Sequence, residues 1–171
     1  VEANRQKNIA QTQQVIAEDR YVAILDMAEG YIQEFYAGIV KLNAAMDVRR
    51  LVLDETLEHL NTLQSTSHDD PELEALIAYT HSEYGKYFAS LRSANVLDTE
   101  QAMVQLNNAI QKFEDLVDNG HTKYGRNLAL AHYRISDIKK ILEEYDGCLD
   151  ELDKATPVIE KFVQEYPDNV L

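Results

Sequence analysis

Apolar residues recur at steps of three and four over most of the chain, the spacing of one face of an α-helix. The first such region covers residues 3–42 and begins with a polar, Gln-rich segment. A second region covers residues 48–64, with Asp47 as the expected N-cap, and the polar loop STSHDDP follows it. The pattern therefore predicts long helices from the start of the chain.

Two further helices are marked by their ends. Asp70 before Pro71 predicts an N-cap followed by proline in the first turn, and this helix is expected to end near Ser93. The sequence DTEQ at residues 98–101 is a capping-box pattern that opens the next helix. Gly120 follows its last apolar residues and predicts a left-handed helix end there.

The last two helices are expected over residues 122–142 and 145–166. Pro157 lies inside the second apolar stripe, which continues beyond it, so we expect a kink and not a break. Small residues stand where two packed helices need to come close: Ser136, Cys148 and Ala155.

These elements predict an all-α fold of about six helices in one domain, residues 1–171. We expect three antiparallel helical hairpins, at about 3–64, 71–118 and 122–166. The chain has 6 glycines and 3 prolines, fewer than the many turns of a sheet protein require, and 45% of its residues are hydrophobic. A packed helical core is therefore expected.

The charge and the cysteine content exclude some kinds of partner and of covalent link. The formal net charge is −14, which opposes binding to nucleic acid or to an anionic membrane surface. The single cysteine rules out a disulfide within the chain. No apolar run reaches the roughly 18–20 residues of a membrane span, and no signal peptide is visible. The chain begins at Val1 without methionine, so we expect a segment of a longer protein or a processed product.

Two stretches share a spacing of large and small residues. Tyr84-Gly85-x-x-Phe88, followed by Ala102-x-x-x-Leu106-x-x-Ala109, parallels Ile135-Ser136, followed by Cys148-x-x-x-Leu152-x-x-Ala155. This spacing resembles the tetratricopeptide repeat over about residues 71–166. Two departures from the family pattern are visible. The spacing from Gly85 to Ala102 is five residues longer than the family's spacing, which Ser136 to Cys148 has, and Lys139 stands where the family has an aromatic residue.

The resemblance implies a right-handed stack of helical hairpins whose first helices line a groove for a protein or peptide. A Lys/Asn/Arg clamp for acidic tails, known in one subclass, has only Lys86 and Lys140 here, so we expect a basic or amphipathic partner instead. Carried onto this sequence, the groove positions are Tyr79, Ser82, Lys86, Ala89, Leu130, Tyr133, Asp137 and Lys140.

The stretch from Asp47 to Leu91 also resembles repeat regions attached to bacterial receptor-type serine/threonine kinases and related multidomain regulators. It implies a non-catalytic scaffold that forms the regulatory or sensing part of a larger bacterial signalling protein. The alternative is an extracytoplasmic helical bundle that senses a small molecule. A homodimer through the first helix is a third reading. These readings allow a membrane anchor outside this segment. They also allow the segment to be either a cytoplasmic or an extracytoplasmic part of the protein.

The chain lacks several known sequence motifs for catalysis and metal binding, which also favours a non-catalytic protein. The chain has no Glu-x-x-His, no His-Glu-x-x-His and no phosphate-binding loop. We interpret Cys148 as a buried packing thiol, His132 as a hydrogen-bonded packing histidine and residues 68–70 as a helix-capping loop. Neither a cofactor nor a metal is expected, and we do not expect an enzyme.

Overall fold

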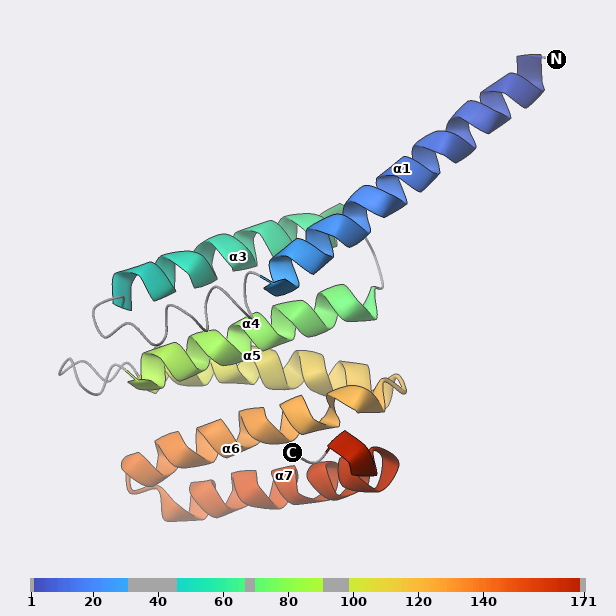
Figure 1. Ribbon diagram of the computed structural model, residues 1–171. Coiled ribbons are helices and arrows are strands. Elements are labelled where there is room, and N and C mark those ends of the chain that lie inside the picture. The colour runs from blue at the N-terminus through green and yellow to red at the C-terminus, as the bar shows by residue number, and fades with distance from the viewer. Residues whose placement is uncertain (1, 31–45, 67–69, 91–98, 170–171) are drawn as a thin grey trace. The chain divides into compact units, whose positions relative to one another are not determined.

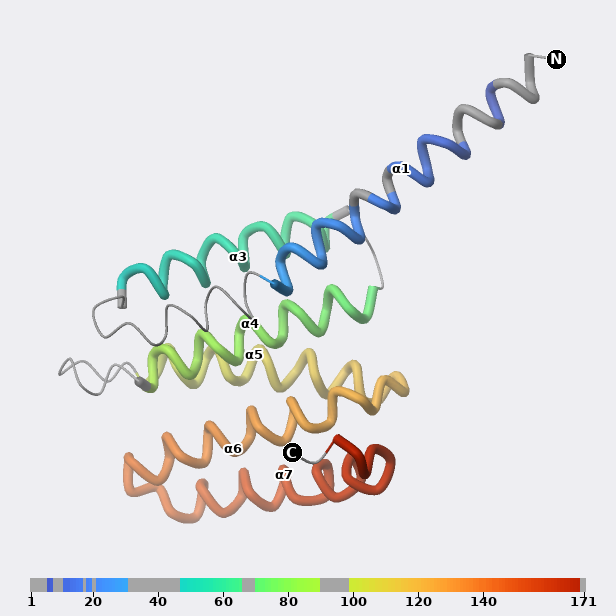
Figure 2. The backbone as a smooth tube through the Cα atoms, viewed as in Figure 1, coloured from blue at the N-terminus to red at the C-terminus, as the bar shows by residue number. Residues whose placement is uncertain are grey.

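The computed structural model describes residues 2–30, 46–66, 70–90 and 99–169 (Figure 2). The chain divides into two compact units, Val1–Ala45 and Met46–Leu171, and each is described by itself. The described residues form six α-helices and two short 3-10 helices, with no strand among them. The predicted all-α class is therefore confirmed. None of the described helices combines the length and the apolar character that crossing a membrane requires.

The first unit contributes α1, Glu2–Gly30, a helix of 29 residues. Its exposed Gln14 side chain donates to Glu18, one turn along, at 2.8 Å. The predicted first helix extends to residue 42, and its part beyond Gly30 lies outside the described residues. The helical prediction therefore holds for the described part of this region.

The second unit is a series of antiparallel helices in which each packs against the next along the chain (Figure 1). The pairs α4–α5 and α6–α7 make the most extensive contacts, and α4 also touches α6. Its elements are α3 (Met46–Thr66), α4 (Pro71–Ser90), α5 (Thr99–Asp118), η3 (Thr122–Tyr124), α6 (Gly125–Ile141), α7 (Tyr145–Glu165) and η4 (Pro167–Asn169).

A glycine sets the close approach of α4 to α5. A Cβ atom at Gly85 would lie 2.5 Å from Leu106 Cγ and 3.1 Å from the carbonyl oxygen of Ala102, so only glycine fits. Ala102 and Leu106 are fully buried, and Phe113, about two turns beyond Leu106, is 1% exposed. Burial of these side chains supplies the main stabilisation of the pair.

Two predicted helix ends are confirmed. The Asp70 carboxylate accepts from the backbone N–H groups of Glu72, at 2.9 Å, and Leu73, at 3.3 Å, which makes it the N-cap of α4. Gly120 has a φ of +92°, and the N–H of His121 donates to the carbonyl of Leu116 at 2.9 Å. This bond closes α5 in the left-handed form that glycine allows.

Three expectations are revised or lie out of view. Asp47 is wrong as an N-cap, because α3 begins at Met46 and Asp47 lies within its first turn. Cys148 was expected to be buried, and the structure shows it half-buried. Asp98 lies outside the described residues, and α5 begins at Thr99. Pro157 agrees with prediction in one respect, since α7 continues through it to Glu165.

The turn between α6 and α7 uses an unfavourable residue. Glu143 has a φ of 63°, and the N–H of Glu144 donates to the carbonyl of Lys139 at 2.9 Å. The geometry matches that at Gly120, but a side chain with a Cβ strains the left-handed conformation.

Glu143→Gly is therefore expected to stabilise the protein by about 1 kcal/mol, because glycine relieves this strain. Thermal unfolding followed by circular dichroism measures the effect. Glu144→Gly is the matched control: its φ is −85°, so added chain freedom should leave it equal to or below the parent. A lower melting temperature for Glu143→Gly than for the parent would contradict the assignment.

Ala155 is 8% exposed in α7. Ala155→Trp is expected to overpack α6 against α7 and lower the unfolding free energy by about 1–3 kcal/mol. Urea denaturation measures it, with Thr156→Trp at the neighbouring exposed position as the control. Equal midpoints for Ala155→Trp and the parent would rule out close packing at this site.

Candidate functional site

Four predicted groove residues form one solvent-facing side of α6. They recur at steps of three and four, and all are exposed, with Leu130 at 42% and Tyr133 at 50%. Asp137 and Lys140 continue the same side toward the end of the helix. The structure thus gives α6 an exposed face with two large apolar side chains followed by two of opposite charge.

The four predicted residues of α4 are less accessible. Ser82 is 3% exposed, whereas Tyr79 and Ala89 are half-buried. Lys86 is exposed, and its ammonium group lies 3.2 Å from a carboxylate oxygen of Glu83. Ser82 therefore lies beneath the surface, and Lys86 is the exposed side chain of this set.

An arginine joins α4 to α6 beneath that surface. Arg134 donates to the backbone oxygen of Ser82 at 2.9 Å, to its hydroxyl at 2.6 Å, and to Glu83 at 2.7 Å. The Glu83 side chain is 6% exposed and that of Arg134 is 16% exposed. A buried carboxylate without this partner would be strongly unfavourable, so the contact fixes the two helices against each other.

Tyr79 lies in the field of the same pair. Burial raises the pKa of its phenol, Glu83 raises it further, and Arg134 opposes both. Tyr79 is therefore a neutral group beside a buried ion pair. Sequence reasoning identified Tyr79 and Ser82 but missed Arg134 and Glu83. The available signal was Glu83 within the long apolar run of the helix that begins at Pro71.

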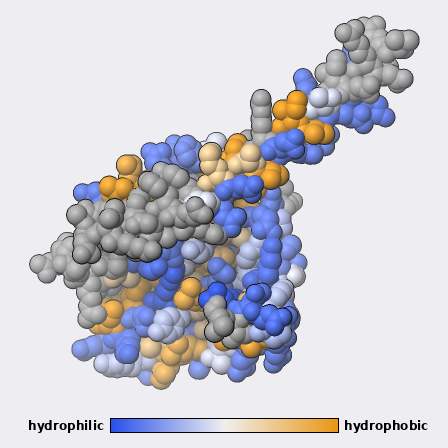
Figure 3. All heavy atoms as spheres, viewed as in Figure 1, coloured by the Kyte–Doolittle hydropathy of each residue, from blue (hydrophilic) through white to orange (hydrophobic). Residues whose placement is uncertain are grey.

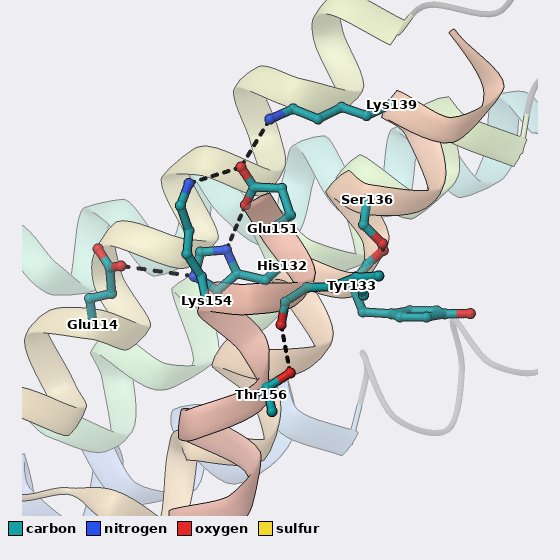
Figure 4. A network of polar contacts seen from close by, with 9 residues as sticks. Glu114, His132, Tyr133, Ser136, Lys139, Glu151, Lys154 and Thr156 are labelled. Carbon is teal, nitrogen blue, oxygen red and sulfur yellow. Dashed lines mark hydrogen bonds and ion pairs between the residues drawn. The ribbon is translucent and has the colours of Figure 1, made fainter. Parts of the chain in front are cut away.

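A second polar network joins α6 to α7 around Glu151, whose side chain is 7% exposed. His132 Nδ1–H donates to one carboxylate oxygen at 2.8 Å, and Lys139 and Lys154 each donate to the other at 3.0 Å. On the far side of the imidazole, Nε2 lies 3.9 Å from Glu114 of α5. Figure 4 shows three cationic or ring nitrogens converging on Glu151, while the Tyr133 ring points away.

Burial alone would raise the pKa of Glu151, but the hydrogen bonds from His132, Lys139 and Lys154 outweigh it and lower the pKa to about 2. Glu151 is thus a carboxylate held ionised inside the α6–α7 interface. The network also explains why Lys139 stands where an aromatic residue was expected, since an aromatic ring cannot neutralise Glu151.

The chemistry of these groups is structural. His132 is 4% exposed and hydrogen-bonded, which confirms its prediction as a packing histidine. Within the described parts of the chain, no three His, Cys, Asp or Glu side chains are placed to hold a metal ion. The buried polar side chains of the two networks are committed to one another, whereas Leu130 and Tyr133 of the α6 face are exposed to solvent.

Two contacts hold η3 to α4. Lys123 and Tyr124 donate to the two carboxylate oxygens of Glu72, at 2.5 and 2.7 Å. Burial and the bond to Glu72 raise the pKa of Tyr124 to about 12, and the bond from Lys123 lowers that of Glu72. Helix α4 is therefore tied to α6 by Arg134 and to η3 by Lys123 and Tyr124.

Comparison of the chain with models of known protein families, with curated proteins and with solved structures finds no match.

Glu151→Gln is expected to lower the unfolding free energy by about 2 kcal/mol at pH 7, because three charge-assisted hydrogen bonds weaken. The folded pKa is depressed, so the contribution of Glu151 is fully present above its ordinary value of 4.5 and is lost as pH falls toward about 2. Urea denaturation at several pH values measures the difference between parent and variant.

That difference should therefore shrink between pH 5 and about pH 2–3. Glu165→Gln, at an exposed position of the same helix, serves as the control and should change stability little at any pH. A destabilisation by Glu151→Gln that stays constant down to pH 3 would refute the ionised state assigned to Glu151.

Proposed function

We propose that this chain is a non-catalytic scaffold that binds a protein or peptide segment along α6 and the adjacent part of α4. The observation that carries the proposal is the exposed α6 face, where Leu130 and Tyr133 stand free of the networks behind them. A few side chains supply most of the binding energy at protein interfaces, and tyrosine is among the most frequent of them.

Rigidity comes from the contacts beneath this face. Arg134 ties α6 to α4 and His132 ties it to α7, so Tyr133 is flanked in sequence by two anchored residues. A side chain presented by an anchored helix loses little conformational entropy when a partner binds. The partner therefore meets a preformed surface.

We further propose that α4–α5 and α6–α7 are two tetratricopeptide-like units in a right-handed array. Support comes from the order of packing, in which each helix contacts the next and α4 also touches α6. It also comes from the small positions of the sequence pattern, because Gly85 meets Leu106 and Ala102 closely. In such an array the first helix of each unit, here α4 and α6, lines the binding face.

The partner's chemistry follows from the face and the charge. Leu130 and Tyr133 require apolar contact, and the formal net charge of −14 draws a basic segment toward the chain as a whole, whereas the α6 face itself carries Asp137 beside Lys140. We propose a basic or amphipathic peptide, with the chain acting as the regulatory or sensing part of a larger bacterial signalling protein. The signalling role rests on the resemblance of residues 47–91 alone.

Tyr133→Ala is expected to weaken peptide binding by about tenfold without unfolding the protein, since Tyr133 is 50% exposed. Peptides selected on the parent chain from a displayed random library provide the ligands, and titration calorimetry measures affinity. Leu51→Ala, an exposed apolar residue of α3, is the matched control. Selected peptides that bind Tyr133→Ala as tightly as the parent would place the binding face elsewhere.

A further inference from the structure

A second exposed apolar surface lies on α7, separate from the proposed peptide face. Tyr145 is 62% exposed, Leu149 59% and Val163 36%. They belong to a stripe that recurs at steps of four and three along the helix, here called the α7 stripe: Tyr145, Leu149, Leu152, Thr156, Ile159 and Val163. Figure 3 shows hydrophobic surface exposed among hydrophilic atoms at the α6–α7 end of the second unit.

The same molecule shows how such a stripe is covered. The repeated pattern aligns Ala102 with Cys148 and Ala109 with Ala155, a shift of 46 residues. At this shift the α7 stripe corresponds to six residues of α5, each of which is less exposed than its counterpart: Thr99, Met103, Leu106, Ile110, Phe113 and Val117. Leu106 of this set meets Gly85 of α4. Helix α6 and η3 also pack on α5, and the rings of Phe113 and Tyr124 lie 6.5 Å apart.

The helix that covers α5 is basic. Helix α6 carries four basic side chains and one acidic one, whereas α5 carries four acidic and one basic, and α7 six acidic and two basic. Helix α6 is thus a basic helix between two acidic ones. His132 contacts Glu114 on one side and Glu151 on the other, so the charge difference is used in direct contacts.

The acidic residues beside the α7 stripe follow the same arrangement. Glu160 is the counterpart of Glu114, the α5 carboxylate that faces His132. Asp146 and Asp153 precede Glu160 at steps of seven, so the three carboxylates lie along one side of the stripe, and all are exposed. An apolar stripe with an acidic border suits a helix with an apolar face and basic flanks.

We propose that the α7 stripe is the docking site for a basic amphipathic helix supplied by another protein, which lies on α7 as α6 lies on α5. A second copy of this chain does not supply that helix. Among the described α-helices only α6 is net basic, and its buried cations already pair with α4 and α7. Two α7 stripes facing each other would bring their acidic borders together at a cost in free energy.

The test uses a synthetic peptide with the sequence of residues 123–142, labelled with a fluorophore and titrated with the full chain. Saturable binding is expected, detected by fluorescence anisotropy. The variant Leu149→Glu should weaken it by roughly tenfold. Val104→Glu, at an exposed apolar position of α5 outside the stripe, adds the same negative charge and should leave binding unchanged or slightly tighter.

This pair separates docking from simple charge attraction, because nonspecific adsorption of a basic peptide would respond equally to both variants. A peptide with Arg126, Lys139 and Lys140 replaced by glutamate should not bind, and Glu160→Gln should weaken the parent peptide about threefold. Tyr133→Ala should leave this peptide's affinity unchanged, so the outcome is independent of the proposed α6 face.

Three results would overturn the proposal. The first is equal affinity for Leu149→Glu and Val104→Glu. The second is that Tyr133→Ala in the full chain abolishes peptide binding while Leu149→Glu in the full chain does not, which would place the peptide on α6. The third is self-association of the parent chain in sedimentation equilibrium that Leu149→Glu abolishes, because the occupant would then be a second copy.

Discussion

The second unit depends on placing the cations of one helix against carboxylates of its neighbours. Arg134, His132 and Lys139 of α6 are all at least partly buried, and burying a charge without a partner is strongly unfavourable. Glu83 of α4 and Glu151 of α7 meet this requirement from opposite sides. Apolar burial brings the helices together, and these pairs select the rotation and the register at which α6 lies between them.

The same constraint separates what is internal from what is available. Arg134 contacts Glu83 of α4 and His132 contacts Glu151 of α7. The Tyr133 ring between them points away from the Glu151 network (Figure 4). Among the described residues of the second unit no α-helix follows α7, and Tyr145, Leu149 and Val163 of α7 remain exposed. The two proposed surfaces are therefore consequences of one packing scheme: the first is the outward side of the basic helix, and the second is an acidic, apolar side that matches another such helix.

Prediction from sequence succeeded where the cause is local. Asp70 caps α4 because its side chain reaches backbone N–H groups two and three residues on, and Gly120 ends α5 because glycine tolerates positive φ. It failed where the cause is a distant residue. The sequence marked Lys139 as a departure from the repeat pattern, and the structure shows that it pairs with Glu151. The sequence marked Ser82 as a groove residue, and the structure shows that it is buried and bound by Arg134.

The sequence by itself determined that this chain is helical, where most of its helices begin and end, and which residues are apolar, because spacing, caps and turns act over a few residues. Only the tertiary structure decided which charges are buried and which apolar residues stay exposed. Phe113 and Ile159 occupy the same place in the pattern, yet Phe113 is 1% exposed and Ile159 is only half-buried. Phe113 has Tyr124 of η3 beside it, at 6.5 Å between ring centroids, and no local pattern in either helix records that neighbour.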